Sequence, residues 1–124
     1  RGDYLTNKKT YGCLYQTDYY RNAIKYICDR IENAVFFVFS DDVEWTKKYF
    51  KGCQFVIVDF NRENQSYIDM QLMSLCKHNI IANSSFSWWA AWLNQFRDKI
   101  VIAPKFWTIN KNIPDIVCDE WIVL

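Results

Sequence analysis

The sequence predicts an α/β domain with a parallel sheet that is covered by helices on both faces. Short apolar runs alternate with segments in which apolar residues recur at helical spacing, in the order strand, helix, strand, helix, strand, helix, strand. The apolar runs are continuous, which is typical of strands buried on both faces of a parallel sheet. The length of 124 residues, 51% hydrophobic and 23% charged, suits one globular domain over residues 1–124.

The first helix and the first strand follow a polar loop at residues 1–17. Thr17 or Asp18 is expected to cap the helix, because their side-chain oxygens can accept from its first free N–H groups. The helix itself is predicted by apolar residues that recur three and four positions apart and so form one stripe. Residues 35–39 are expected to form the first buried strand. The members of the helical stripe are Tyr20, Ala23, Ile24, Ile27, Cys28 and Ile31.

The later elements repeat this alternation. Apolar runs of four residues predict strands, and longer periodic segments predict helices. We expect a short helix that residues 40–42 cap and that ends near Phe50, then a strand at 55–58, a helix at 66–76, a strand at 79–82, a helix at 86–96, a strand at 100–103 and a last short strand at 121–124.

The charge balance argues against nucleic acid as a partner. With 15 basic and 14 acidic residues, the net charge is +1, so no basic surface is expected. No apolar stretch approaches the roughly 20 residues that span a bilayer. The chain begins at Arg1 rather than Met, so we expect it to be a fragment of a longer protein.

The five cysteines are scattered, odd in number and without a CxxC pair. Cys28 and Cys76 fall on the apolar faces of expected helices, which favours buried free thiols in a reducing compartment. A disulfide framework and a metal site remain the alternatives, but the spacing offers no metal-ligand set, so none is predicted. His78 is interpreted as a buried, hydrogen-bonded histidine, with a catalytic base as the alternative.

Residues 83–85 lie where the third strand ends and a strongly apolar helix begins. Free N–H groups and hydroxyls at a helix start favour a phosphate site. The alternative is a simple cap by Ser84 or Ser85. Asn83 is expected to be buried, and the following Trp88, Trp89 and Trp92 are interpreted chiefly as core.

Other polar residues are also expected at the carboxyl ends of the strands, where ligands bind in such sheets. Asp41 and Asp42 follow the first strand and are candidates for binding ligand, with helix capping as the alternative. Asp69, on a helix, faces either the ligand or solvent. Arg1 is a candidate for neutralising a diphosphate, with an Arg-Gly-Asp adhesion motif at residues 1–3 as the weaker alternative.

Several of these segments together resemble the bacterial type of the α-1,2-fucosyltransferase family, glycosyltransferase family 11. The resemblance covers essentially the whole chain, and its third segment is long and specific. The matching segments are residues 1–4, 37–42 with Trp45, 69–92, and 102–105 with Trp107.

The resemblance implies a glycosyltransferase of GT-B type, with two Rossmann-like halves and the active site between them. This chain would be the C-terminal, GDP-sugar-binding half. The implied reaction moves fucose from GDP-fucose to the 2-hydroxyl of a terminal β-galactose. It inverts the anomeric centre and needs no metal and no cofactor besides the donor substrate.

The resemblance also implies roles for single residues. Arg1 and Asp3 would belong to the catalytic phosphate–arginine loop, although the histidine and second arginine that precede Arg1 in the family motif are missing here. Other residues would bind substrate: Asn83, Ser84, Ser85 and Phe86 at the diphosphate, Asp69 at the guanosine end, and Asp41 and Asp42 at the pocket floor.

The implied partners are the nucleotide-sugar donor, a galactose-containing glycan acceptor and the missing N-terminal acceptor half. The fragment is expected to self-associate through surface that this half would cover. A cytoplasmic location is expected, with membrane association as a second possibility. Two other functions stay open: a related glycosyltransferase with another donor or acceptor, and a non-catalytic nucleotide-binding α/β module.

Overall fold

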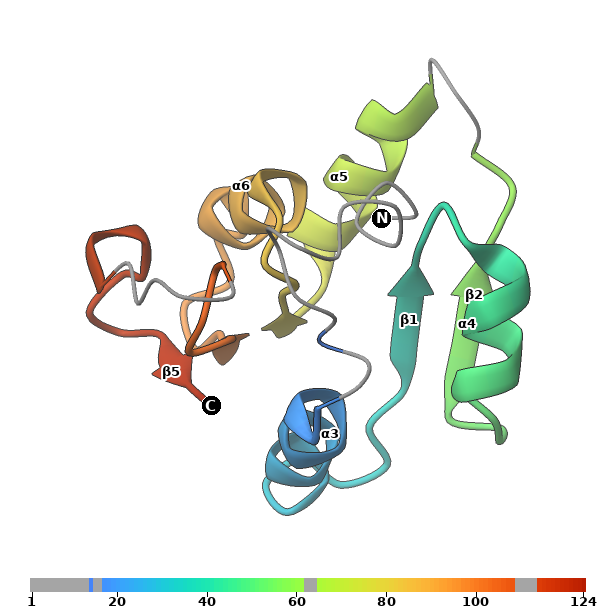
Figure 1. The fold of residues 1–124 in the computed structure, drawn as a ribbon, viewed down its shortest axis with the longest axis horizontal. Helices are drawn as coiled ribbons and strands as arrows, with labels where there is room; N and C mark the ends of the chain where they lie inside the picture. Colours follow the sequence, from blue (N-terminus) through green and yellow to red (C-terminus); the bar gives the residue numbers. More distant parts are fainter. Residues whose placement is uncertain (1–13, 15–16, 62–64, 109–113) are drawn as a thin grey trace.

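The computed structural model describes residues 14, 17–61, 65–108 and 114–124. Strands and helices alternate along this part of the chain, as predicted (Figure 1). The elements are α3 (Tyr19–Cys28), β1 (Phe36–Phe39), α4 (Val43–Tyr49), β2 (Phe55–Val58), α5 (Ser66–Leu75), β3 (Asn79–Ile80), α6 (Ser85–Leu93), β4 (Val101–Ala103), the 3-10 helix η3 (Pro114–Ile116) and β5 (Ile122–Val123).

The described strands form two parallel sheets, whereas the sequence predicted a single sheet. One sheet has the order β1-β2, with Phe36 opposite Phe55. The other has the order β3-β4-β5, with Asn79 opposite Val101 and Ile102 opposite Ile122. In Figure 1 the two sheets lie side by side, and β1 is nearer to the three-stranded sheet than β2 is. No described strand joins β1 to β3.

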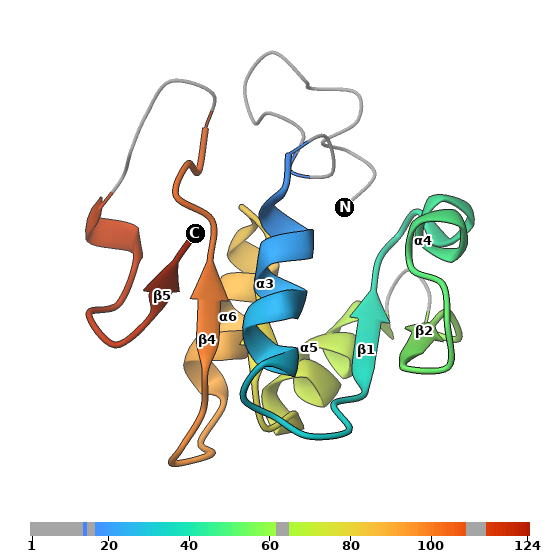
Figure 2. The ribbon, with the colours of Figure 1, turned by 90° about the horizontal axis from the view of Figure 1, so that it is seen from below.

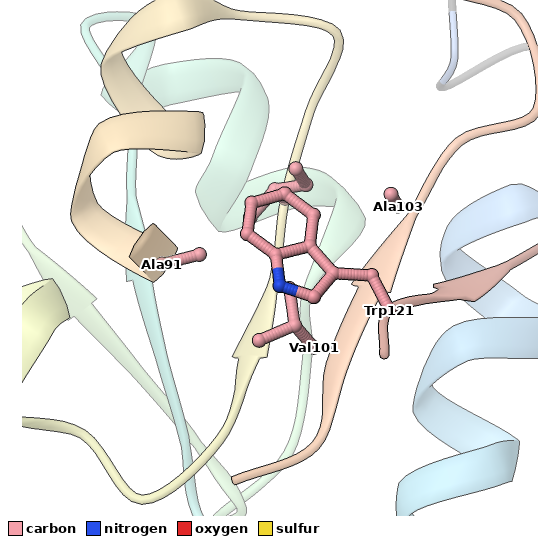
Figure 3. Packing of buried hydrophobic residues seen from close by; sticks show 5 residues of the cluster. Ala91, Val101, Ala103 and Trp121 are labelled. Carbon is pink, nitrogen blue, oxygen red and sulfur yellow. The ribbon is translucent and has the colours of Figure 1, made fainter. Parts of the chain in front are cut away.

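The three-stranded sheet has helices on both faces, which confirms that part of the prediction. Val101 and Ala103 of β4 pack with Ala91 of α6 and with Trp121, whose ring lies among them in Figure 3. Side chains alternate between the two faces along a strand, so Ile102 points the other way. It packs against Tyr19, Ala23 and Ile27 of α3. Accordingly, all three residues of β4 are buried.

The prediction of burial on both faces is wrong for β1 and β2. Phe37 is 53% exposed and Val56 is 41% exposed. Their neighbours Phe36 and Phe55 pack together on the opposite face, with ring centroids 5.4 Å apart. One face of this two-stranded sheet is therefore covered and the other is open. The prediction failed because a continuous apolar run does not reveal what covers each face of a strand.

The stripe predicted for the first helix is partly wrong. Ala23 and Ile27 are buried as expected and Tyr20 is half-buried against the same cluster, but Tyr19, which the predicted stripe left out, is the fully buried residue of the first turn. Asp18 stands at the N-cap without a side-chain capping bond, while Thr17 Oγ1 accepts a hydrogen bond from Tyr19 N at 3.2 Å. The helix is therefore turned so that a tyrosine hydroxyl enters the core.

The cysteines within the described residues are free thiols, as predicted. Their expected burial is wrong for Cys28, which is exposed together with Cys53. Cys28 is the last residue of α3 and lies off its buried side. Cys76 is half-buried, and this burial raises the pKa of its thiol. Cys13 lies outside the described residues.

Two asparagines connect the end of α6 to the start of β3. Asn94 is 2% exposed, and its Nδ2 donates to Asn79 Oδ1 and to the carbonyl oxygen of Cys76, each at 2.7 Å. Asn79 in turn donates to the carbonyl oxygen of Met73 at 2.8 Å. Buried amides cost free energy unless their hydrogen bonds are satisfied, so this network fixes α6 relative to α5 and β3.

Candidate functional site

The polar residues singled out in the sequence follow the carboxyl ends of β1, β2 and β3. In Figure 2 the arrowheads of β1 and β4 point in the same direction, so these ends lie toward one side of the molecule. Open parallel α/β sheets bind their ligands at this edge. The residues at this edge therefore form the candidate site.

The segment after β3 leads into α6 and is the most buried part of the edge. Asn83 and Ser84 are 3% and 4% exposed. Asn83 Nδ2 donates to the carbonyl oxygen of Trp107 at 3.0 Å, which ties this turn to the segment after β4. The expected burial of Asn83 is thus confirmed, and its side chain is occupied in holding the turn.

Ser84 stands at the N-cap of α6 in extended conformation, with φ −135° and ψ 129°. Its side chain makes no capping hydrogen bond, so capping by the Ser84 hydroxyl is a wrong interpretation. The Ser84 carbonyl oxygen accepts instead from Trp88 N and from Ser87 Oγ, each at 3.0 Å. The N–H groups of the first helical turn have no acceptor within the helix, and they carry the positive end of its dipole.

Ser85 is the first residue of α6 and is exposed, whereas Phe86 is half-buried. Ser87 Oγ also lies 3.2 Å from the carbonyl oxygen of Ala82, so its hydroxyl holds the turn from the inner side. The start of α6 therefore combines a fixed backbone with a solvent-facing first residue. Such a helix terminus is chemically suited to bind phosphate.

Asp42, after β1, is the N-cap of α4. Its Oδ1 accepts from Trp45 N at 3.0 Å, and its own N–H donates to Ser40 Oγ at 3.1 Å. Thr46 Oγ1 donates to its carbonyl oxygen. Capping, the alternative interpretation, is confirmed for Asp42. Asp41 is exposed beside it, and a binding role for either carboxylate stays a prediction.

Asp69 lies in the first turn of α5 and is half-buried. Asn61, which follows β2, donates from Nδ2 to Asp69 Oδ1 at 2.7 Å. The carboxylate therefore faces the carboxyl edge of β2 rather than bulk solvent alone. Sequence reasoning did not select Asn61, although its place directly after a strand was a signal that could have found it.

His78 lies at the opposite edge, because it precedes β3. Its Nδ1 accepts a hydrogen bond from Ile100 N at 3.0 Å. Desolvation, with a smaller contribution from the charge of Lys77, lowers the pKa of this imidazole. The predicted hydrogen bond is therefore confirmed, but the predicted burial is wrong, because His78 is only half-buried.

Arg1 and Asp3 lie outside the described residues. Within the described ranges, no three His, Cys, Asp or Glu side chains gather into a group able to hold a metal ion. Over the same ranges, no helix has both the length and the apolar composition to cross a membrane. Among the described residues, the structure places Asn83, Ser84 and Ser85 on one turn after β3, Asp42 on the turn after β1 and Asp69 in the first turn of α5.

The Trp residues of α6 differ from the prediction of core packing. Trp88 packs against the core, and its Nε1 donates to the carbonyl oxygen of Ile116 at 2.6 Å. Trp89 and Trp92 are 49% and 53% exposed. The core interpretation is therefore wrong for these two residues.

Comparison with known proteins gives a match along the whole chain. The model of glycosyl transferase family 11 matches residues 1–124. The O-antigen biosynthesis glycosyltransferase WbnK of Escherichia coli is 48% identical over 128 residues, which cover 100% of this chain and 42% of the relative. No solved structure matches the chain.

Two further relatives carry names that state a linkage. An alpha-1,2-colitosyltransferase of Escherichia coli is 50% identical over 113 residues, covering 86% of this chain and 38% of the relative. The human galactoside alpha-(1,2)-fucosyltransferase 1 is 31% identical over 97 residues, covering 75% of this chain and 27% of the relative. The chain thus spans at most about two-fifths of these proteins, and by the match over its full length it belongs to glycosyl transferase family 11.

Proposed function

We propose that this chain is the donor-binding part of a transferase that moves fucose from GDP-fucose to the 2-hydroxyl of a terminal β-galactose. The carrying observation is the family match over residues 1–124, which includes the buried turn before α6. The names of two relatives state an alpha-1,2 transfer of a sugar. On this proposal, the anomeric centre of fucose is inverted and no metal is needed.

The start of α6 supplies the electrostatic part of the mechanism. As the bond between fucose and GDP breaks, positive charge develops on the sugar ring and negative charge on the departing β-phosphate. The N–H groups of Ser85 and Phe86 and the helix dipole stabilise that negative charge, and the fixed turn at Ser84 keeps them in place. Arg1 and Asp3 act beside this turn in the proposal, with Arg1 as a second donor to the diphosphate.

The carboxylates have separate tasks in the same proposal. Asp69 accepts N–H groups of the guanine base through Oδ2, while Asn61 holds Oδ1. Asp42 keeps the turn after β1 in shape by capping α4, and Asp41 beside it lines the donor. The group that deprotonates the acceptor hydroxyl belongs to the acceptor-binding half, which completes the active site. That half and the glycan acceptor are the proposed partners, and the cytoplasm is the proposed location.

A donor panel tests the proposed function. A protein that contains this chain together with an acceptor half is incubated with lactose and GDP-fucose, GDP-mannose or UDP-glucose, and release of free nucleotide is measured. Release of GDP only with GDP-fucose, and a product fucosylated at the 2-hydroxyl of galactose, is the expected result. Nucleotide binding without any release would favour a non-catalytic module instead.

A colitosyl donor is the second candidate, because the relative named as an alpha-1,2-colitosyltransferase is 50% identical over 86% of this chain. The two candidates share the nucleotide site and differ in the sugar. Adding GDP-colitose to the panel separates them. A kcat/KM that is higher for GDP-colitose than for GDP-fucose would replace fucose by colitose in the proposal and leave the role of α6 unchanged.

A further inference from the structure

The amide of Asn61 and the carboxylate of Asp69 form one polar pair where the chain leaves β2. Asn61 Nδ2 donates to Asp69 Oδ1 at 2.7 Å, and the two residues are eight positions apart in the sequence. Both residues are half-buried, so their surroundings restrain them and solvent still reaches them. A ligand at the carboxyl end of β2 can therefore meet the two side chains together.

The orientation of this pair is set by charge. Asp69 lies in the first turn of α5, where the helix dipole stabilises a negative group. A hydrogen bond from an amide to a carboxylate is charge-assisted, which makes it shorter and stronger than a bond between neutral groups. The bond therefore holds both side chains in one arrangement before any ligand binds.

The pair offers a donor beside an acceptor. An asparagine amide carries two N–H groups, and the bond to Asp69 uses one of them. The second N–H can donate to another acceptor. The carboxylate oxygens of Asp69 only accept, and Oδ2 is not the oxygen that Asn61 contacts. A ligand that matches this arrangement must present an acceptor next to a donor.

The edge of a 6-oxopurine has this arrangement. Guanine presents the acceptor O6 next to N–H donors at N1 and at the 2-amino group, whereas adenine presents an amino donor at position 6 next to an acceptor at N1. Adenine in the same place would set donor against donor and acceptor against acceptor. A site built to hydrogen-bond its ligand rejects a ligand that leaves these groups unpaired.

We propose that Asn61 determines the base specificity of the donor site, by donating its second Nδ2–H to O6 of the guanine while the first holds Asp69. This inference rests on the proposed function, because it concerns the base of the same GDP-sugar. It adds a direct contact between Asn61 and the substrate. The ligand class is a 6-oxopurine nucleoside diphosphate, which includes IDP and excludes ADP.

Equilibrium titration with GDP, IDP and ADP tests the proposal, on protein that includes the acceptor half. The ratio of the Kd for ADP to the Kd for GDP measures the base selectivity. Asn61→Ala removes the donor, and Asn61→Asp replaces it by an acceptor. Asn22→Ala is the matched control, because it is the same substitution at an exposed position of α3.

We expect the unsubstituted protein to bind GDP and IDP at least about 100-fold more tightly than ADP. Asn61→Ala should lower the selectivity ratio roughly tenfold. It should weaken GDP and IDP by the same factor, because both carry O6. Asn61→Asp should lower the ratio further, because an acceptor then faces O6 and suits the amino group of adenine. Asn22→Ala should leave the ratio unchanged.

A merely structural role for Asn61 predicts a different result. Asn61→Ala would then weaken all three nucleotides by one factor, and the unchanged ratio would overturn this inference while the proposed function stands. If Asn61→Ala does not fold, the ratio in Asn61→Asp decides in the same way. Unsubstituted protein that binds ADP as tightly as GDP would instead contradict the proposed donor, and this inference with it.

Discussion

The hydroxyl of Tyr19 donates a hydrogen bond to the carbonyl oxygen of Ile81 at 2.6 Å. The same hydroxyl lies 3.0 Å from the carbonyl oxygen of Ile102. It therefore connects the first turn of α3 to the backbone just before Asn83 and Ser84, the turn that leads into α6. A buried phenol thus helps to fix the segment on which the proposed phosphate contacts depend.

Replacing Tyr19 by Phe should lower the free energy of unfolding by about 1–3 kcal/mol, because the buried carbonyl oxygen of Ile81 loses this donor, whereas that of Ile102 still accepts from Ile81 N. Urea unfolding measures the change. Tyr67→Phe is the matched control, since Tyr67 is 66% exposed and should change stability by less than about 0.5 kcal/mol. Equal effects of the two substitutions would contradict the role given to the Tyr19 hydroxyl.

Stability should fall at alkaline pH. Burial, with a smaller contribution from Tyr49, raises the pKa of Tyr20 from 10.0 to about 12. Burial, and then Tyr20, raises the pKa of Tyr19 well above 10.0. Below pH 10 both phenols are protonated in the folded and unfolded states, so the stabilisation is complete there. Above pH 10 the unfolded state loses these protons first, and the free energy of unfolding decreases as the pH rises toward 12.

The free energy of unfolding measured between about pH 9 and pH 12 tests this expectation. Tyr20→Phe should make the decrease with pH shallower, because one of the phenols that ionise preferentially in the unfolded state is gone. An equally steep decrease in Tyr20→Phe would assign the pH dependence to other groups.

The contribution of the α6 N-terminus to donor binding can be isolated at Ser85. Proline is tolerated at the first position of a helix, and Ser84 already has the extended conformation that a following proline requires. Ser85→Pro therefore removes one N–H group and leaves the helix in place. Its affinity for GDP should fall roughly tenfold or more, since a hydrogen bond to a charged group is lost.

Ser85→Ala is the control for this experiment, because it removes the hydroxyl and keeps the N–H group. Isothermal titration with GDP, on protein that includes the acceptor half, gives both affinities. An equal loss in Ser85→Ala and Ser85→Pro would show that the hydroxyl, which both variants lack, and not the N–H group of the helix terminus, binds the phosphate.

The exposed aromatic residues of α6 should drive self-association of the isolated chain. Trp89, Trp92 and Leu93 are 49%, 53% and 46% exposed on one helix. Apolar surface of this kind is typical of an interface. Sedimentation velocity at two concentrations should show a species larger than the monomer. The substitution Trp92→Gln should lower the proportion of this species. Phe60→Gln, at a site that is 68% exposed and far from α6 in the sequence, should leave it unchanged.

The sequence predicted the elements well because each strand is a separate apolar run. The predicted strand at 55–58 coincides with β2, and the predicted strand at 100–103 contains β4. The division into two sheets was not predictable, because strand pairing depends on neighbours that are far apart in the sequence. The exposure of Trp89 and Trp92 was missed for a related reason: a helix that is apolar all round predicts burial but does not say what buries it.

For the candidate site, the sequence predicted the turn at 83–85 and the burial of Asn83. It could not decide whether Ser84 caps α6, because capping depends on the rotamer of one hydroxyl. It also selected Asp69 without its partner, because the contact with Asn61 joins the end of β2 to the first turn of α5, and the sequence does not show that these two turns meet. Contacts within one turn could thus be predicted from the sequence, and contacts between turns could not.

The separation between Tyr19 and Ile102 has a consequence for the speed of folding. The hydroxyl of Tyr19 contacts the carbonyl oxygen of Ile102, 83 residues away in the sequence. A loop that contains most of the chain must therefore close before this contact forms. The β1–α4–β2 segment, in contrast, pairs strands that are joined by a single helix. Because closing a longer loop costs more conformational entropy, we expect β1 and β2 to pair early and α3 to dock late. Substitutions at Tyr19 should therefore accelerate unfolding while leaving the refolding rate nearly unchanged.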